Sequence, residues 1–281
     1  MKPGGVHSIL EETHMSEENH LMSQADELPL ASKKTKEQWL DEGHLLSFYA
    51  PIRPEEGLAA YEQAIRLDPT YELAWRMKAT PLRALKRYEE ALAAYELAIS
   101  LDPTDVQAYI GKGDILYELK RYEEALLTYE QAIALEPTSA EAYNGKAISL
   151  SFLNREEEAL AAYEQVIRLD DDEPVYSYLA YLNSTTILAR LSHYEEALAA
   201  CEGAIRLEPR YAYAHVDKGW LLERLARYEE ALAAYQEASR LEPNDAGIWR
   251  SIGDVLTTLG RPQEAQQAYE KARQLDSEEQ A

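Results

Sequence analysis

The stretch 87–96 reads RYEEALAAYE, and close copies of it recur along the chain at a nearly constant distance. The copies are RYEEALLTYE at 121–130, REEEALAAYE at 155–164, HYEEALAACE at 193–202 and RYEEALAAYQ at 227–236. Successive copies are 34 residues apart, except for one step of 38. A fixed period of this size predicts stacked supersecondary units rather than the compact core of an enzyme.

A second landmark divides the chain into units. Leu-Asp-Pro or Leu-Glu-Pro closes most of them, as at Leu67-Asp68-Pro69 and Leu101-Asp102-Pro103. Proline stops a helix because it lacks an amide donor and disfavours helical geometry in the residue before it. The landmarks predict one array over 36–276 with seven units, at about 36–70, 71–104, 105–138, 139–172, 173–210, 211–244 and 245–276.

Each unit contains two helical patterns, which the third unit shows most clearly. The first covers about 106–119 and the second about 122–135, with apolar residues at spacings of three and four. Small residues at Gly113 and Ala125 would let the two helices approach closely, and Tyr129 would fill the space between neighbouring pairs. The composition is rich in Ala, Leu and Glu, which are strong helix formers. The chain is therefore predicted to be all-α.

The constant positions resemble the tetratricopeptide repeat (TPR). In the third unit they are Tyr109, Gly113, Leu116, Tyr122, Ala125, Tyr129, Ala132 and Pro137. The resemblance implies a right-handed α-solenoid of antiparallel helix pairs, in which the first helices line a concave groove and the second helices form the convex back.

Charge narrows the classes of partner. The chain has 281 residues, with 51 acidic and 28 basic side chains and a net charge of −23. This balance opposes binding to nucleic acid and to anionic membranes, both of which require basic surfaces. There is no apolar leader and no apolar run of about 18 residues. A cytoplasmic protein is expected. The single cysteine, Cys201, stands where other copies carry tyrosine and is predicted to lie in the core.

Several segments depart from the repeat. Residues 1–35 and 277–281 are predicted to be disordered tails. The first unit has a longer connection that contains Pro51 and Pro54. The fifth gains four residues around 171–177, about one helical turn, which predicts either a longer first helix from Pro174 or a longer loop. It also has Thr185 in place of a small residue. The last second helix is polar, as expected of a solenoid cap.

No catalytic constellation is evident in the sequence. GKGD at 111–114 lacks the residues of a phosphate-binding loop and falls within a predicted helix. There is no HExxH motif and no cysteine pair for zinc. Acidic pairs recur in every unit, whereas a catalytic pair should be unique. We therefore expect a protein that is not an enzyme and needs no cofactor or metal.

The first helices differ between units much more than the second helices do. This variation suggests that they contact different parts of a protein or peptide ligand. The candidate binding residues are Arg76, Arg83, Ile110, Tyr117, Asn144, Ile148, Phe152, Arg190, Tyr213, Val216, Trp220, Arg224 and Arg250. Trp220 is the strongest candidate, because no other unit has Trp there and a structural residue should recur. By contrast, Lys78, Lys112, Lys146 and Lys218 recur, which predicts a structural role, either beside a neighbouring carboxylate or along the edge of the core.

The leading hypothesis is a non-catalytic interaction scaffold with a peptide in its groove. The first alternative is a structural spacer that self-associates through its solenoid ends. An enzyme with a hidden site and an RNA-binding helical array are further alternatives, and the acidic charge disfavours the second of these. Some TPR proteins bind chaperone tails through a clamp of Lys and Asn side chains. That set is not assembled here: Arg76 falls at one of the corresponding positions, but Thr80, Gly111 and Glu141 occupy the next three. Binding of chaperone tails is therefore not expected.

Overall fold

The computed structural model describes residues 34–49, 53–169 and 175–279, and all its regular structure within these ranges is helical. The first helices are α2 (Lys36–Phe48), α4 (Glu72–Ala84), α6 (Val106–Glu118), α8 (Ala140–Phe152), α10 (Val175–Arg190), α12 (Ala212–Arg224) and α14 (Ala246–Thr258). The second helices are α3 (Pro54–Leu67), α5 (Tyr88–Leu101), α7 (Tyr122–Leu135), α9 (Glu156–Leu169), α11 (Tyr194–Leu207), α13 (Tyr228–Leu241) and α15 (Pro262–Glu279). The all-α fold class is confirmed.

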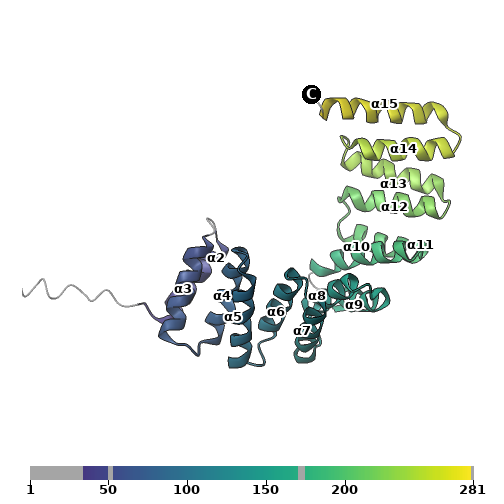
Figure 1. Cartoon of the computed structure of the whole chain (residues 1–281). Helices are drawn as coiled ribbons and strands as arrows, with labels where there is room; N and C mark the ends of the chain where they lie inside the picture. Colours follow the sequence, from purple (N-terminus) through teal and green to yellow (C-terminus); the bar gives the residue numbers. More distant parts are fainter. Residues whose placement is uncertain (1–33, 50–52, 170–174, 280–281) are drawn as a thin grey trace, which may run out of the picture. The chain divides into compact units, whose positions relative to one another are not determined.

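The chain divides after Arg87 into two compact units, and Figure 1 labels the helices of both. Unit 1 contains α2, α3 and α4, and α3 contacts both of the others. Thr35 begins α2 with a capping box, in which its side chain and that of Gln38 each accept from the other's backbone amide. Pro54 is the first residue of α3, so the prediction that it lies inside the connection was wrong. Proline fits there because the first turn of a helix needs no amide donor. Pro51 and residues 1–33 lie outside the described residues.

Unit 2 runs from α5 to the end of α15. Its first and second helices pair in order, and each second helix contacts the first helix of the next repeat. The stacking of α12, α13, α14 and α15 is visible at the green-to-yellow end of Figure 1. The core follows these contacts, with small alanines at the closest approaches and leucines and tyrosines between them.

Tyrosine rings fill the junctions between repeats. Tyr129 is 3% exposed and comes from α7. A Cβ atom added at Gly113 in its own repeat would lie 2.7 Å from this ring, and one added at Gly145 in the next repeat would lie 2.3 Å from it. The ring is therefore held between two first helices, at positions where only glycine leaves room. Its hydroxyl donates to the carboxylate of Asp114 at 2.7 Å.

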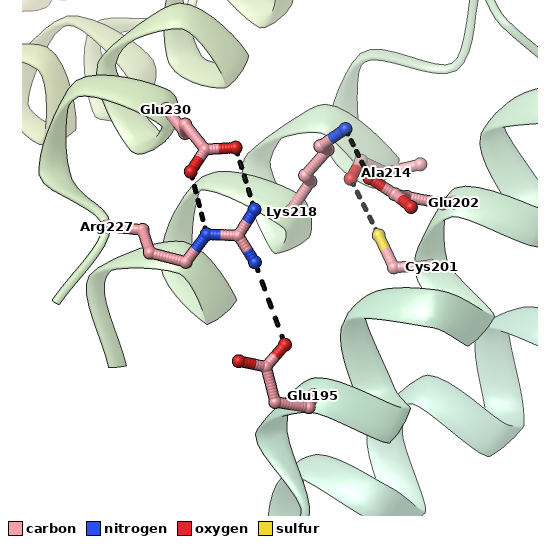
Figure 2. Close-up of polar contacts among 7 residues, drawn as sticks. All are labelled: Glu195, Cys201, Glu202, Ala214, Lys218, Arg227 and Glu230. Atoms are coloured by element: carbon pink, nitrogen blue, oxygen red, sulfur yellow. Dashed lines mark hydrogen bonds and ion pairs between the residues drawn. The ribbon is translucent and has the colours of Figure 1, made fainter. Parts of the chain in front are cut away.

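The charged residues of the repeated stretch form ion pairs within and between repeats. Figure 2 shows Arg227, at the start of α13, with Glu230 of the same helix at 2.7 Å and with Glu195 of the preceding second helix at 3.6 Å. The same figure shows Lys218 of α12 paired with Glu202 of α11 at 2.7 Å. The other recurring lysines make the equivalent contact: Lys78 with Glu62, Lys112 with Glu96 and Lys146 with Glu130. The predicted structural role of these lysines is confirmed.

A left-handed residue links the two helices of most repeats. Residues Lys86, Lys120, Asn154, Ser192 and Ala226 have φ between 57° and 64°, and Gly260 has φ 70°. At each turn the next residue donates its amide to a carbonyl five residues earlier, as from Arg227 to Leu222 at 2.8 Å. This bond closes the end of the first helix, a position where glycine is the residue with least strain.

The fifth repeat has the longer first helix, since α10 has 16 residues and α12 has 13. Pro174 and most of the predicted insertion lie outside the described residues.

Cys201 is fully buried, as predicted, and its thiol donates to the Ala214 carbonyl at 3.2 Å (Figure 2). Burial raises the pKa of this thiol to about 12. At the end of the chain, α15 continues to Glu279, so the prediction that the disordered tail begins at 277 was wrong. No helix in the described ranges is long and apolar enough to cross a bilayer.

Candidate functional site

The first helices of unit 2 line a series of hollows, three of which contain most of the candidate residues. The first hollow, named here the aromatic pocket, has a volume of about 490 Å³ and lies among α6, α8, α9 and α10. Tyr117, Ile148, Phe152 and Arg190 all line it. Four candidates chosen from three different repeats are therefore brought to one site.

An aromatic cluster forms one side of the aromatic pocket. Phe152 is 52% exposed and stacks on Tyr122 at a centroid distance of 4.9 Å, and its edge contact with Tyr117 is 5.4 Å. Arg190 is not a free cation, because its guanidinium is 2.6 Å from the carboxylate of Glu156. Burial raises the pKa of Tyr163, which also lines the pocket. The site thus offers an apolar surface with one neutralised charge at its edge.

The second hollow, named here the Asp217 pocket, has a volume of about 410 Å³ and lies among α10, α12, α13 and α14. Val216 and Trp220 line it, and Trp220 is 44% exposed. Arg224 lies beside it, with its guanidinium 5.9 Å from the Trp220 ring and 5.3 Å from the Tyr194 ring. The three residues Tyr194, Trp220 and Arg224 form one exposed cluster.

The third hollow, named here the end pocket, has a volume of about 780 Å³ and a mainly polar lining from α12, α14 and α15. Tyr213 donates its hydroxyl to Asp245 at 3.1 Å, and this bond raises the pKa of Tyr213. Arg250 makes two contacts with Asp276, at 2.6 and 2.7 Å. Two of the candidate arginines, Arg190 and Arg250, are therefore already paired with carboxylates of the protein itself.

The remaining candidates do not join these hollows. Ile110 is 2% exposed and Asn144 is 9% exposed, so the structure presents neither side chain to a ligand. Arg76 and Arg83 lie on α4 in unit 1, whereas the three pockets are lined by residues of unit 2. Arg83 is exposed and Arg76 is half-buried.

Sequence reasoning missed residues that only the packing brings together. Asp217 and Ser251 line the Asp217 pocket, and Asn183 lines the aromatic pocket. All three stand at the same repeat position, which is Gly111 and Gly145 in the earlier units. The sequence held a signal for them, because this position changes from glycine to polar residues in the last three repeats.

These hollows offer contact surfaces for a ligand. They combine exposed aromatic rings with carboxylates and hydrogen-bonding groups, an arrangement suited to binding side chains. In the described ranges no group of three or more His, Cys, Asp or Glu side chains is placed to hold a metal ion. The geometry thus defines a helical-repeat protein. Pockets that differ in size and lining lie along its first helices.

The family follows from matches to four family models. They are described as TPR repeat or tetratricopeptide repeat, and they match residues 82–130, 113–150, 140–173, 186–246 and 216–279. The chain belongs to the tetratricopeptide repeat proteins. No curated protein matches the chain in sequence.

Solved structures share the fold at low sequence identity. PilF of Pseudomonas aeruginosa has a TM-score of 0.63 at 17% identity, over 79% of this chain and 97% of its own. YrrB, described as a TPR protein with an unusual peptide-binding site, has a TM-score of 0.55 at 22% identity, over 66% of this chain and 94% of its own. A chain of the APC/C hetero-tetramer Cut9–Hcn1 has a TM-score of 0.59 at 16% identity, over 85% of this chain and 46% of its own. The TPR-like α-solenoid architecture is therefore confirmed.

Proposed function

We propose that the protein is a non-catalytic interaction scaffold that binds a peptide or protein segment on the surface lined by its first helices. The family membership supports the general role of a protein-interaction module. YrrB, which has the same fold, is described with a peptide-binding site, and Cut9 is described in a complex with Hcn1. The proposal extends this kind of role to the pockets of unit 2.

The observation that supports the proposal best is the exposure of large aromatic side chains beside the pockets of the first helices. Phe152, Tyr213 and Trp220 are 52%, 52% and 44% exposed, whereas the repeat tyrosines Tyr129, Tyr163 and Tyr235 are buried in the core. Exposed aromatic and arginine side chains often dominate the energetics of an interface. Peptide binding would remove their apolar surface from water, and the varied pockets would distinguish one sequence from another.

The test begins with selection of random peptides on the full-length chain by phage display. Affinities of the selected peptides are then measured by fluorescence anisotropy for the wild type and for Trp220→Ala/Arg224→Ala. We expect the double variant to weaken binding by ~2 kcal/mol or more, about 30-fold. The reason is that it removes two members of the exposed cluster and leaves the buried core unchanged.

A matched control removes the same kinds of side chain from second helices. Leu127→Ala/Arg240→Ala truncates one apolar and one cationic residue, of which Leu127 is 61% exposed and Arg240 has a 67% exposed side chain. This control should bind the peptides like the wild type, and circular dichroism melts should show that both variants are folded. Equal affinity of the wild type and the Trp220/Arg224 variant would remove the first-helix surface from consideration. Light scattering over a concentration series would then test the spacer alternative.

A further inference from the structure

Three side chains have changed together at the junction between the fifth and sixth repeats. In the third repeat, the Tyr129 ring lies between Gly113 of its own first helix and Gly145 of the next. The equivalent residues in the fifth and sixth repeats are Cys201 for the tyrosine, and Thr185 and Asp217 for the two glycines. The ring is lost, and both positions that made room for it carry larger polar side chains.

The Asp217 pocket lies at this junction, and both Thr185 and Asp217 line it. Cys201 is fully buried and its thiol bonds to the Ala214 carbonyl, so it does not line the opening (Figure 2). Thr185 is 4% exposed and lies at the wall of the Asp217 pocket, which also contains Asp217 itself. The polar wall is thus built from two first helices, α10 and α12.

Asp217 carries a charge that the protein does not neutralise. Its carboxylate makes no ion pair or hydrogen bond within the part of the chain that the structure describes, although its side chain is exposed to the pocket. The cations nearest in sequence are used elsewhere. Lys218 is 2.7 Å from Glu202 (Figure 2), and Arg224 donates to the Tyr194 hydroxyl at 3.3 Å. Glu223 accepts from the Tyr235 hydroxyl at 2.6 Å, so it does not add a second free carboxylate.

The Asp217 side chain is exposed to the pocket, but protein atoms around it remove part of its hydration. Surrounding protein atoms raise the pKa of Asp217, since they displace water that would stabilise its negative charge. A bound cation would supply that stabilisation. The rest of the lining combines an apolar and aromatic surface, which includes Val216, Leu221 and the Trp220 ring, with the polar residues Thr186 and Ser251.

We infer that the Asp217 pocket binds a lysine or arginine side chain of the partner peptide. The Asp217 carboxylate would pair with the cationic head, and the apolar wall would cover the aliphatic stem, which such side chains readily bury. The Trp220 ring would add a cation–π contact. A volume of about 410 Å³ is ample for such a side chain. The net charge of −23 favours a basic partner further, because it attracts cationic segments from a distance.

This inference rests on the proposed function, since it identifies the chemistry of the peptide that the first-helix surface would take. The Asp217 pocket differs in charge from the aromatic pocket, where Arg190 already neutralises Glu156. Only the fifth-to-sixth junction combines a lost tyrosine with a carboxylate at the glycine position.

The test uses peptides selected on the full chain whose binding depends on Trp220. Each lysine or arginine of such a peptide is replaced in turn by norleucine or citrulline, which keep the shape and remove the charge. Affinities are measured for the wild type, for Asp217→Asn and for Glu164→Gln. The last variant removes an exposed carboxylate on α9 and so matches the change in net charge. Asp217→Ser, which introduces the residue found at the equivalent position 251, replaces Asp217→Asn if that variant unfolds.

We expect one basic residue of the peptide to be essential. Its neutralisation should weaken binding to the wild type and to Glu164→Gln about tenfold, and should have little effect on Asp217→Asn, which itself binds the original peptide about tenfold more weakly. Wild-type affinity of Asp217→Asn for Trp220-dependent peptides would overturn this inference and leave the proposed function standing. If no peptide depends on Trp220 and Arg224, both fail together.

Discussion

The backbone of Ala226 lies in the left-handed region, with φ 57°, where its Cβ atom crowds the following carbonyl. The turn needs this conformation because Arg227 donates to Leu222 from it. The last repeat has Gly260 at the same position, with φ 70° and open space around it. The chain thus contains both the strained and the relaxed form of one turn.

We therefore predict that Ala226→Gly stabilises the protein by about 1 kcal/mol, since glycine adopts this φ without a steric penalty. Chemical denaturation of the two proteins would measure the difference. Ala238→Gly is the control, because Ala238 lies inside α13 and is fully buried there. The control should destabilise by about 1 kcal/mol or more. Loss of stability in Ala226→Gly would show that the alanine makes contacts worth more than its strain.

At the scale of helices, the tyrosine rings are the main link between neighbouring repeats. Tyr129→Ala should lower the free energy of unfolding by ~3 kcal/mol or more, because it empties the space between α6 and α8. Tyr129→Phe keeps the ring and loses the hydrogen bond to Asp114, so it should cost about 1 kcal/mol. Leu127→Ala on the exposed side of the same helix should change little. Thermal and urea melts would rank the stabilities of the three variants. If Tyr129→Ala had the same free energy of unfolding as the wild type, the ring could not be packed between α6 and α8.

The helices themselves could be predicted from the sequence because their signals are local. The prolines, the apolar spacing and the small residues each act within one repeat, so α6 and α7 end within one residue of their predicted bounds. The turn at Ala226 gave no such signal. Its residue type does not favour the left-handed region, and the need for that conformation comes from the bond that closes α12.

The exposure of side chains at the candidate site could not be predicted from local sequence signals. Ile110, Asn144, Val216 and Arg250 occupy one repeat position, yet the first two are buried and the last two line pockets. How closely the next helix pair covers this position depends on side chains from two repeats at once. Cys201 in place of a tyrosine and Asp217 in place of a glycine are such a case. Only the packing of α11 against α12 shows that the two positions belong to one junction.

For the whole molecule, the dominant electrostatic quantity is the net charge of −23. Two effects of salt oppose each other. Screening weakens the Lys–Glu and Arg–Glu pairs, but exposed pairs of this kind contribute only ~0–1 kcal/mol each. Screening also reduces repulsion among the excess carboxylates, which acts over distances near the Debye length of about 10 Å at 0.1 M salt. Since acidic residues outnumber basic ones by 51 to 28, we expect the second effect to be larger.

Raising NaCl from low to near-molar concentration should therefore increase the Tm by several degrees, on the order of 2–4 °C for each kcal/mol gained. Melts followed by circular dichroism would measure it. Glu136→Gln/Glu208→Gln provides the internal comparison, because both carboxylates are exposed at the C-terminal ends of helices, where negative charge is unfavourable, and neither forms an ion pair within the described residues. This variant should melt higher than the wild type at low salt and gain less from added NaCl, since part of the repulsion is already gone. A fall in Tm with salt would instead mean that the ion-pair network between repeats outweighs the repulsion, and the pairs at Lys112, Lys146 and Lys218 would then be the first to remove.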